Sequence, residues 1–145
     1  EKPYQLHWKN IKMVAWDDKF SFGISIIDEE HKKFIGILNK AIIAKEHNNK
    51  PEEIKEVLKE MNNYALEHFT TEEAYMKKFK YPEYKSHKKE HHDFSMTTSA
   101  ILKKVIKGDY QIIKDTLLYL VGWLLNHIQV TDRKYIDCFK KNGLK

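Results

Sequence analysis

Two side chains able to bind a metal ion, His68 and Glu72, stand four residues apart in a stretch with helical periodicity. Residues with this spacing lie one turn apart on the same face of a helix. The apolar residues before them recur in steps of three or four, the spacing of a helix face turned toward a core: Ile54, Leu58, Met61 and Ala65. Since burying a carboxylate is costly unless it is paired or bound to a metal, the pair predicts an inward-facing ion pair or metal site.

The same arrangement recurs along the chain. Five of the eight histidines fall on apolar helix faces, together with the carboxylates Glu72 and Asp132. The five are His31, His68, His87, His91 and His127. One such histidine is most often a satisfied core residue. Burying this whole set would cost about 1–3 kcal/mol for each unsatisfied polar group, so a shared ligand is expected to satisfy them together.

The elements that must position these residues are four amphipathic helices joined by short turns. Periodicity and the breakers Pro51, Pro82 and Gly108 place them at about 26–46, 51–79, 83–107 and from 109 onward. The predicted fold is all-α: an up-down-up-down four-helix bundle with a short C-terminal helix. We expect residues 1–23 to form an irregular N-terminal arm packed across the bundle, and residues 24–145 to form the domain.

In this topology all seven candidate ligands converge at one end of the bundle. One pair needs a local adjustment, because His127 and Asp132 are five residues apart rather than four. On a regular helix their directions would diverge by about 140°. We therefore expect the helix to loosen or break between them, so that Asp132 turns back toward the other ligands.

Imidazole and carboxylate ligands suit iron, zinc, copper or manganese, and the number of ligands favours two ions. Two six-coordinate ions need twelve ligand positions. Five imidazoles, two bridging carboxylates and one bridging solvent oxygen fill eleven of them. One position on one ion stays open, which suits the binding of a small molecule such as dioxygen.

Four motifs carry a resemblance to a known family. They are DEEH at 28–31, HFTTE at 68–72, HKKEH at 87–91 and HIQVTD at 127–132. With these motifs the chain resembles hemerythrin-like domains of the bacterial type, the bacteriohemerythrins. The resemblance implies reversible dioxygen binding, for storage, delivery or scavenging, at two non-haem iron ions with an oxo or hydroxo bridge.

The resemblance also implies a role for each ligand. His87, His91 and His127 would hold one iron. His31 and His68 would hold the second, whose sixth position stays open to dioxygen, and Glu72 and Asp132 would bridge the two. The family lines its oxygen pocket with apolar side chains, and the matching positions here are Phe69, Trp123, Leu124 and Ile128. At a further pocket position, Phe34 is bulkier than the aliphatic residue of some members.

Other functions stay open from the sequence. The same site could serve an oxygen- or redox-sensing domain with a fused signalling module. A di-iron oxidase, a peroxidase and a nitric oxide reductase are less favoured, because the ligands are rich in histidine and no Glu-x-x-His pair occurs. A structural zinc site is least favoured, since such sites use four ligands. We therefore expect a carrier rather than an enzyme, with an oxygen-consuming enzyme as a conceivable partner.

Composition and charge exclude several other classes of protein. The net charge of +5 comes from lysines interspersed with acidic residues, which disfavours nucleic-acid or membrane-surface binding. The strongest apolar run, 117–125, is too short to span a bilayer. The single cysteine, Cys138, excludes a disulfide framework, and we expect a cytoplasmic protein. Residues 1–12 precede the family's usual start near Met13. We expect them to be either a linker from a larger protein or an added arm. His7 and His47 are expected to be exposed, and His92 to face away from the core.

Overall fold

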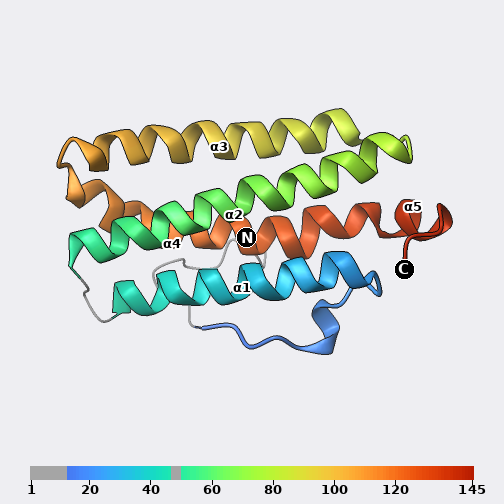
Figure 1. Ribbon diagram of the computed structural model, residues 1–145, viewed down its shortest axis with the longest axis horizontal. Coiled ribbons are helices and arrows are strands. Elements are labelled where there is room, and N and C mark those ends of the chain that lie inside the picture. The colour runs from blue at the N-terminus through green and yellow to red at the C-terminus, as the bar shows by residue number, and fades with distance from the viewer. Residues whose placement is uncertain (1–12, 47–49) are drawn as a thin grey trace, which may run out of the picture.

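The computed structural model describes residues 13–46 and 50–145, apart from the side chains of residues 45–46, 110 and 112–116. Its main elements are four long helices that run antiparallel to their neighbours (Figure 1): α1 (Ser25–Glu46), α2 (Pro51–Lys78), α3 (Tyr84–Ile106) and α4 (Tyr110–Asn126). Beyond α4 the chain continues through His127–Thr131 and Asp132–Tyr135 into the short helix α5 (Ile136–Lys141). No strand occurs within the described ranges. The predicted all-α bundle and its short C-terminal helix are confirmed.

The turn between α2 and α3 is fixed by backbone hydrogen bonds that close the end of α2. The amide of Tyr81 donates to the carbonyl of Met76 at 2.9 Å, and the amide of Lys80 donates to that of Lys77 at 3.2 Å. These two bonds form a Schellman motif, which requires a left-handed residue after the helix. Lys80 takes that role with a φ of 55°, a conformation that glycine adopts more easily. Pro82 then separates the two helices, as the sequence predicts.

The apolar core consists of two clusters. The larger one fills most of the bundle's length and includes Phe34, Leu58 and Leu124. The smaller one closes the end at which α1 begins and α2 ends, and it includes Ile27, Met76 and Tyr135. In α1, His31 lies between Ile27 of the smaller cluster and Phe34 of the larger one. In α2, Glu72 lies between Phe69 of the larger cluster and Met76 of the smaller one. The seven polar side chains therefore form a buried layer between two apolar regions.

The described part of the N-terminal arm packs against α1. Asn39 exchanges two hydrogen bonds of 2.8 Å with the backbone of Val14, and Asp28 accepts one of 2.8 Å from the amide of Phe22. Phe22 belongs to the smaller core cluster. Apart from a 3-10 turn at Asp18–Phe20, this stretch is irregular, as expected. Residues 1–12 lie outside the described residues.

No helix of the described chain is long and apolar enough to cross a membrane.

Candidate metal centre

The structure brings all seven predicted ligands together at one level of the bundle. α1 supplies His31, α2 supplies His68 and Glu72, and α3 supplies His87 and His91. His127 and Asp132 come from the segment that directly follows α4. All seven side chains are buried, with at most 3% of their surface exposed. By contrast, His92 is exposed although it neighbours His91, as its position off the core line predicts. His7 and His47 lie outside the described residues.

A π-helical turn over His127–Thr131 brings Asp132 to the site. In this turn the amide of Asp132 donates to the carbonyl of His127, five residues earlier, instead of to the residue four earlier. The wider turn absorbs one extra residue, so a spacing of five places both side chains on the same side of the helix. The predicted loosening of the helix is confirmed, and the chain stays helical through it.

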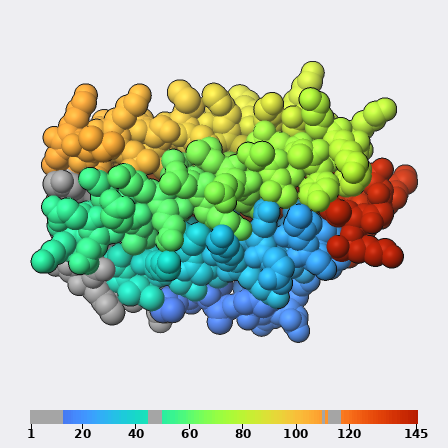
Figure 2. Space-filling view, in the orientation of Figure 1, coloured from blue at the N-terminus to red at the C-terminus, as the bar shows by residue number. Residues whose placement is uncertain are grey.

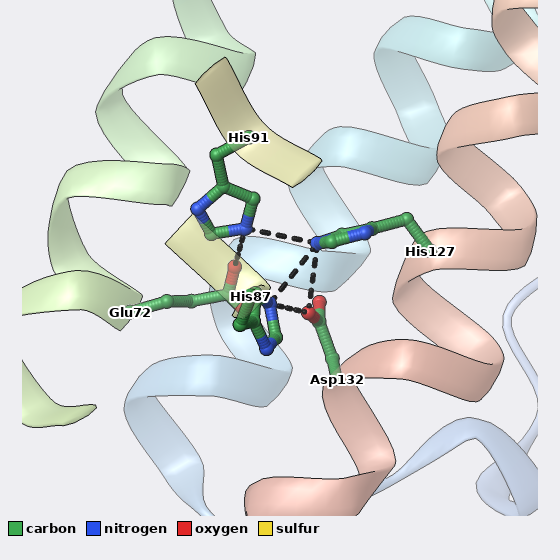
Figure 3. Close-up of side chains that lie close together, drawn as sticks. All are labelled: Glu72, His87, His91, His127 and Asp132. Atoms are coloured by element: carbon green, nitrogen blue, oxygen red, sulfur yellow. Dashed lines mark hydrogen bonds and ion pairs between the residues drawn. The ribbon is translucent and has the colours of Figure 1, made fainter. Parts of the chain in front are cut away.

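The ligand atoms form two overlapping groups, each with its potential ligands within 4.8 Å of one another. The first group combines three imidazoles with both carboxylates (Figure 3): His87, His91, His127, Glu72 and Asp132. The second combines two imidazoles with the same two carboxylates: His31, His68, Glu72 and Asp132. The shared carboxylates make this a candidate two-metal centre with unequal halves.

Asp132 lies between the two groups and presents one carboxylate oxygen to each. Its Oδ1 is 3.0 Å from Nε2 of His87 and 3.1 Å from Nε2 of His127. Its Oδ2 is 3.3 Å from Nε2 of His31 and 3.7 Å from Nε2 of His68. A carboxylate in this orientation can bridge two ions, one bound by each group.

Glu72 is oriented in the same way from the opposite side of the centre. Its Oε1 is 3.3 Å from Nε2 of His91, and its Oε2 is 3.5 Å from Nε2 of His68. The hydroxyl of Tyr135 donates a hydrogen bond of 2.7 Å to Oε2. Glu72 therefore offers a second bridge, one oxygen of which also accepts a hydrogen bond from the C-terminal segment.

The distances between imidazoles are those expected of neighbouring ligands on one metal ion. Nε2 of His127 lies 3.1 Å from that of His87 and 2.9 Å from that of His91, while the His31 and His68 Nε2 atoms are 3.1 Å apart. Adjacent ligands of an octahedral ion with bonds of about 2.1 Å are separated by about 3.0 Å.

The carboxylate oxygens give independent support for a metal. Oε1 of Glu72 and both oxygens of Asp132 are buried without a hydrogen-bond partner among the described residues. Leaving so many buried anionic oxygens unsatisfied is unfavourable, so a cation between them would satisfy this layer. The residues present therefore fit a pair of metal ions.

Two glutamates orient the imidazoles from outside the centre. Glu30 Oε1 lies 2.7 Å from Nδ1 of His68, and Glu73 Oε2 lies 2.8 Å from Nδ1 of His91. With Nδ1–H donating to the glutamate, the lone pair of Nε2 points to the centre. Thr71 holds Glu30 in turn, through a hydrogen bond of 2.9 Å from its hydroxyl.

Sequence reasoning did not identify these two glutamates. Glu30 and Glu73 each stand directly beside a ligand in the sequence, where helical spacing would point a side chain away from the core. Both side chains are about one quarter exposed. Nothing in the spacing separates such a glutamate from one on a solvated helix face. An acidic residue adjacent to a predicted ligand is the one signal that was available.

The charges of this layer shift its protonation equilibria. Burial alone lowers the pKa of His68, but the carboxylates of Glu72, Asp132 and Glu30 outweigh it and raise that pKa to about 10. For His91, burial again lowers the pKa, while Glu72 and Glu73 raise it to about 9. Without a metal, both imidazoles therefore carry a proton at neutral pH.

The acidic groups respond to the same surroundings. Burial raises the pKa of Asp132, but the positive charge of the surrounding histidines, His127 foremost, holds it well below its usual range. Burial and the nearby Glu72 raise the pKa of the Tyr135 phenol well above its usual range. Asp132 is thus a carboxylate and Tyr135 a neutral donor across the physiological pH range.

Two of the predicted pocket residues stack on ligands of the three-histidine group. The ring of Phe69 lies parallel to that of His91 at 3.8 Å between centroids, and Trp123 stacks on His127 at 4.9 Å. Leu124 and Ile128 are buried in the larger core cluster. All four belong to the larger core cluster or pack against it.

Different aromatic rings meet the two-histidine group. The edge of Phe22 meets His31 at 4.8 Å between centroids, and Phe34 meets His68 at 5.7 Å. Phe34 was recognised from the sequence as a bulky pocket position. Phe22 was assigned only to the arm, because the aromatic residues of that segment follow no period.

Comparison with known proteins agrees with this geometry. Residues 23–139 match the family model of the hemerythrin HHE cation-binding domain. The chain is 35% identical to a bacteriohemerythrin of Clostridium acetobutylicum, over 86% of this chain and 100% of that protein. It is also 35% identical to a myohemerythrin of Theromyzon tessulatum, over 83% of this chain and 88% of that protein.

Among solved structures, the fold is similar to that of a wild-type hemerythrin crystal structure. The TM-score is 0.78 at 27% identity, and the match covers 88% of this chain and 98% of that one. Residues 23–139, which match the family model, contain the π turn and both groups of ligands. This chain therefore belongs to the hemerythrin family of HHE cation-binding domains.

Proposed function

We propose that this protein binds dioxygen reversibly at a non-haem di-iron centre. The observation that carries the proposal is the inequality of the two ligand groups. Three imidazoles and two carboxylates form one, while two imidazoles and the same carboxylates form the other. With a shared oxo or hydroxo bridge, one ion would be six-coordinate and the second would keep one position for an exogenous ligand.

Each predicted ligand has a role in this proposal. His87, His91 and His127 would hold the six-coordinate iron, and His31 and His68 the other. Each carboxylate would contribute one oxygen to each ion, in agreement with the orientations of Glu72 and Asp132. The iron pair, when bound, supplies the redox chemistry by which dioxygen is taken up and released.

The surrounding residues control what reaches the centre. Phe69, Trp123, Leu124 and Ile128 exclude water from one side, and Phe22 and Phe34 cover the two-histidine group. We take residues 24–145 as the domain that carries the site. The described part of the arm, residues 13–23, brings Phe22 to it.

The burial of the ligands favours carriage over turnover of a larger substrate. None of the seven side chains has more than 3% of its surface exposed. A diatomic molecule can reach such a site through small fluctuations of the surrounding side chains, whereas an organic substrate would need the bundle to open. We therefore assign the protein to oxygen storage, delivery or scavenging rather than to an enzymatic pathway.

Metal analysis with a matched pair of variants tests this proposal. We expect about two irons per chain, as the two ligand groups require. His91→Ala should lose iron from the three-histidine group, whereas His92→Ala, one residue away and exposed, should keep the full complement. A single zinc per chain, or equal loss in both variants, would contradict the assignment.

A further inference from the structure

A series of packed aromatic rings leads from the centre to one end of the molecule. Tyr135 contacts the site twice, through its hydrogen bond to Glu72 and through its ring, which stacks on His87 at 5.9 Å. On its other side, Tyr135 stacks on Phe139 at 4.1 Å with an interplanar angle of 8°. Phe139 meets Phe79 at 5.6 Å. Each step from the ligand layer outward is a direct contact between rings.

The series ends at the molecular surface. Phe79 and Tyr75, the last two rings, are partly exposed and stack on each other at 5.8 Å. Phe139 also contacts Tyr75, at 5.8 Å. The electron-tunnelling rate falls steeply with distance and with gaps in packing. A contiguous set of buried contacts is therefore a favourable route between the centre and this surface.

The surface around these last rings is basic. It consists of the end of α2 and the C-terminal segment, residues 77–80 and 136–145, and is called the basic end face below. The C-terminal segment caps this end of the molecule (Figure 2). The two stretches contain six lysines, all exposed, and one aspartate: Lys77, Lys78, Lys80, Lys140, Lys141, Lys145 and Asp137. The amine of Lys78 lies 5.7 Å from the Phe79 ring centroid.

Among the residues whose side chains the structure describes, the opposite end of the bundle mixes lysines with carboxylates. There Lys50, Lys103, Lys104 and Lys107 share the surface with Glu52 and Glu53 at the start of α2 and with Asp109 before α4. The basic end face therefore carries six lysines and one aspartate where the ring series reaches the surface, with Glu29 and Glu83 exposed nearby at the same end of the bundle. A partner with an acidic surface would be steered to this face.

We propose that the basic end face is the docking site of an acidic one-electron carrier protein that reduces the centre through Tyr135 and Phe139. This inference rests on the proposed function, because an iron pair that has become fully ferric no longer takes up dioxygen. Two electrons restore the ferrous pair. Two reduced carriers are therefore oxidised by one electron each for every chain that is restored.

Charge-reversal variants test the docking site. The iron-loaded ferric chain is mixed with reduced plant-type ferredoxin, chosen as an acidic one-electron donor. Reversal of three lysines on the basic end face, Lys77→Glu, Lys78→Glu and Lys141→Glu, should lower the second-order reduction rate about tenfold at low ionic strength. The difference should disappear at about 1 M salt, where the Debye length is about 3 Å.

The matched control reverses the same number of charges at the opposite end, with Lys103→Glu, Lys104→Glu and Lys107→Glu. In both triple variants, two substitutions fall in the last turn of a long helix, so helix-dipole effects are comparable. The control should reduce at close to the unmodified rate. Equal slowing of both variants, or of neither, would overturn the proposal.

A binding measurement separates docking from electron transfer. Calorimetric titration with oxidised ferredoxin should show weaker binding for the end-face variant only.

Phe79→Leu, which keeps every lysine, should retain binding but slow reduction; an unchanged rate would overturn the role of the ring series. The reaction of each ferrous variant with oxygen is recorded on the same samples. If the unmodified ferrous chain does not react with oxygen, the proposed function is wrong. If it does react but the end-face variant binds and is reduced like the unmodified chain, this inference alone is wrong.

Discussion

The hydroxyl of Tyr135 donates a 2.7 Å hydrogen bond to Glu72 Oε2, and both side chains are fully buried. Tyr135 belongs to the 3-10 turn that follows the π turn, whereas Glu72 lies in α2, so the bond joins the C-terminal segment to the candidate bridge. This contact couples two features of the fold, because the π turn that returns Asp132 to the site also positions Tyr135.

Tyr135→Phe should destabilise the metal-free chain by about 1–3 kcal/mol, since it leaves a buried carboxylate oxygen without its donor. Urea unfolding of the metal-free protein measures this change. Tyr119→Phe is the matched control, because the Tyr119 side chain is 53% exposed. Equal effects of the two substitutions would show that the buried hydrogen bond contributes little.

Glu30→Gln should weaken metal binding by about 10- to 100-fold, because the amide replaces a carboxylate that accepts from Nδ1 of His68. Competition with a chelator would measure the change. Glu29→Gln makes the same substitution one residue away, on a side chain that is 74% exposed, and should have no effect. If both variants bound metal as the unmodified chain does, Glu30 would have no orienting role.

Metal uptake at pH 7 should release about two protons per chain from His68 and His91, in addition to those lost by the bridging solvent oxygen. Their pKa values in the metal-free chain are about 10 and about 9, and a metal ligand must be unprotonated. The release should decrease as the pH approaches 9. Calorimetry in two buffers of different ionisation enthalpy gives the proton count, and a count near zero at pH 7 would contradict these pKa shifts.

The same shifts determine how the stability of the metal-free chain depends on pH. Both folded-state pKa values lie above the unfolded histidine value of about 6.5, so the folded state binds more protons between these limits. Their stabilising contribution is therefore complete below about pH 6.5 and is lost as the pH rises through 9 and 10. The urea midpoint of the metal-free chain should be higher at pH 6.5 than at pH 9. A higher midpoint at pH 9 would contradict these pKa shifts.

Lys80→Gly should stabilise the fold by about 1 kcal/mol, because Lys80 holds a left-handed φ of 55° at the end of α2. Lys77→Gly, inside the last turn of the same helix, should destabilise it by about 1 kcal/mol. Thermal unfolding of the two variants should thus shift in opposite directions. Shifts of the same sign would show that the left-handed residue is not strained.

Much of the fold followed from local signals. Pro51, Pro82 and Gly108 mark helix ends in the sequence, and the observed ends lie within one or two residues of the predicted ones. The spacing of His127 and Asp132 predicted that the helix loosens or breaks between them, because a regular helix could not have directed both side chains to one site. The structure shows that this loosening is a π turn. Convergence of the ligands followed from topology alone.

The groups around the ligands could not be predicted in the same way. Glu30 and Glu73 reach imidazoles because each long side chain extends to the neighbouring helix, and spacing does not report side-chain conformation. Phe22 meets His31 because Asp28 anchors the arm, a tertiary contact without periodicity. Phe69 and Trp123 were expected in the pocket, but ring packing decides that they stack on the three-histidine group.

The most direct test of the central claim is reversible oxygenation of the iron-loaded chain. The reduced protein, with two irons per chain, is exposed to oxygen and then to argon while its visible spectrum is recorded. We expect a charge-transfer band that appears with oxygen, disappears under argon and returns over repeated cycles. A band that never reverses, or continuous oxygen consumption when a reductant is present, would contradict the central claim.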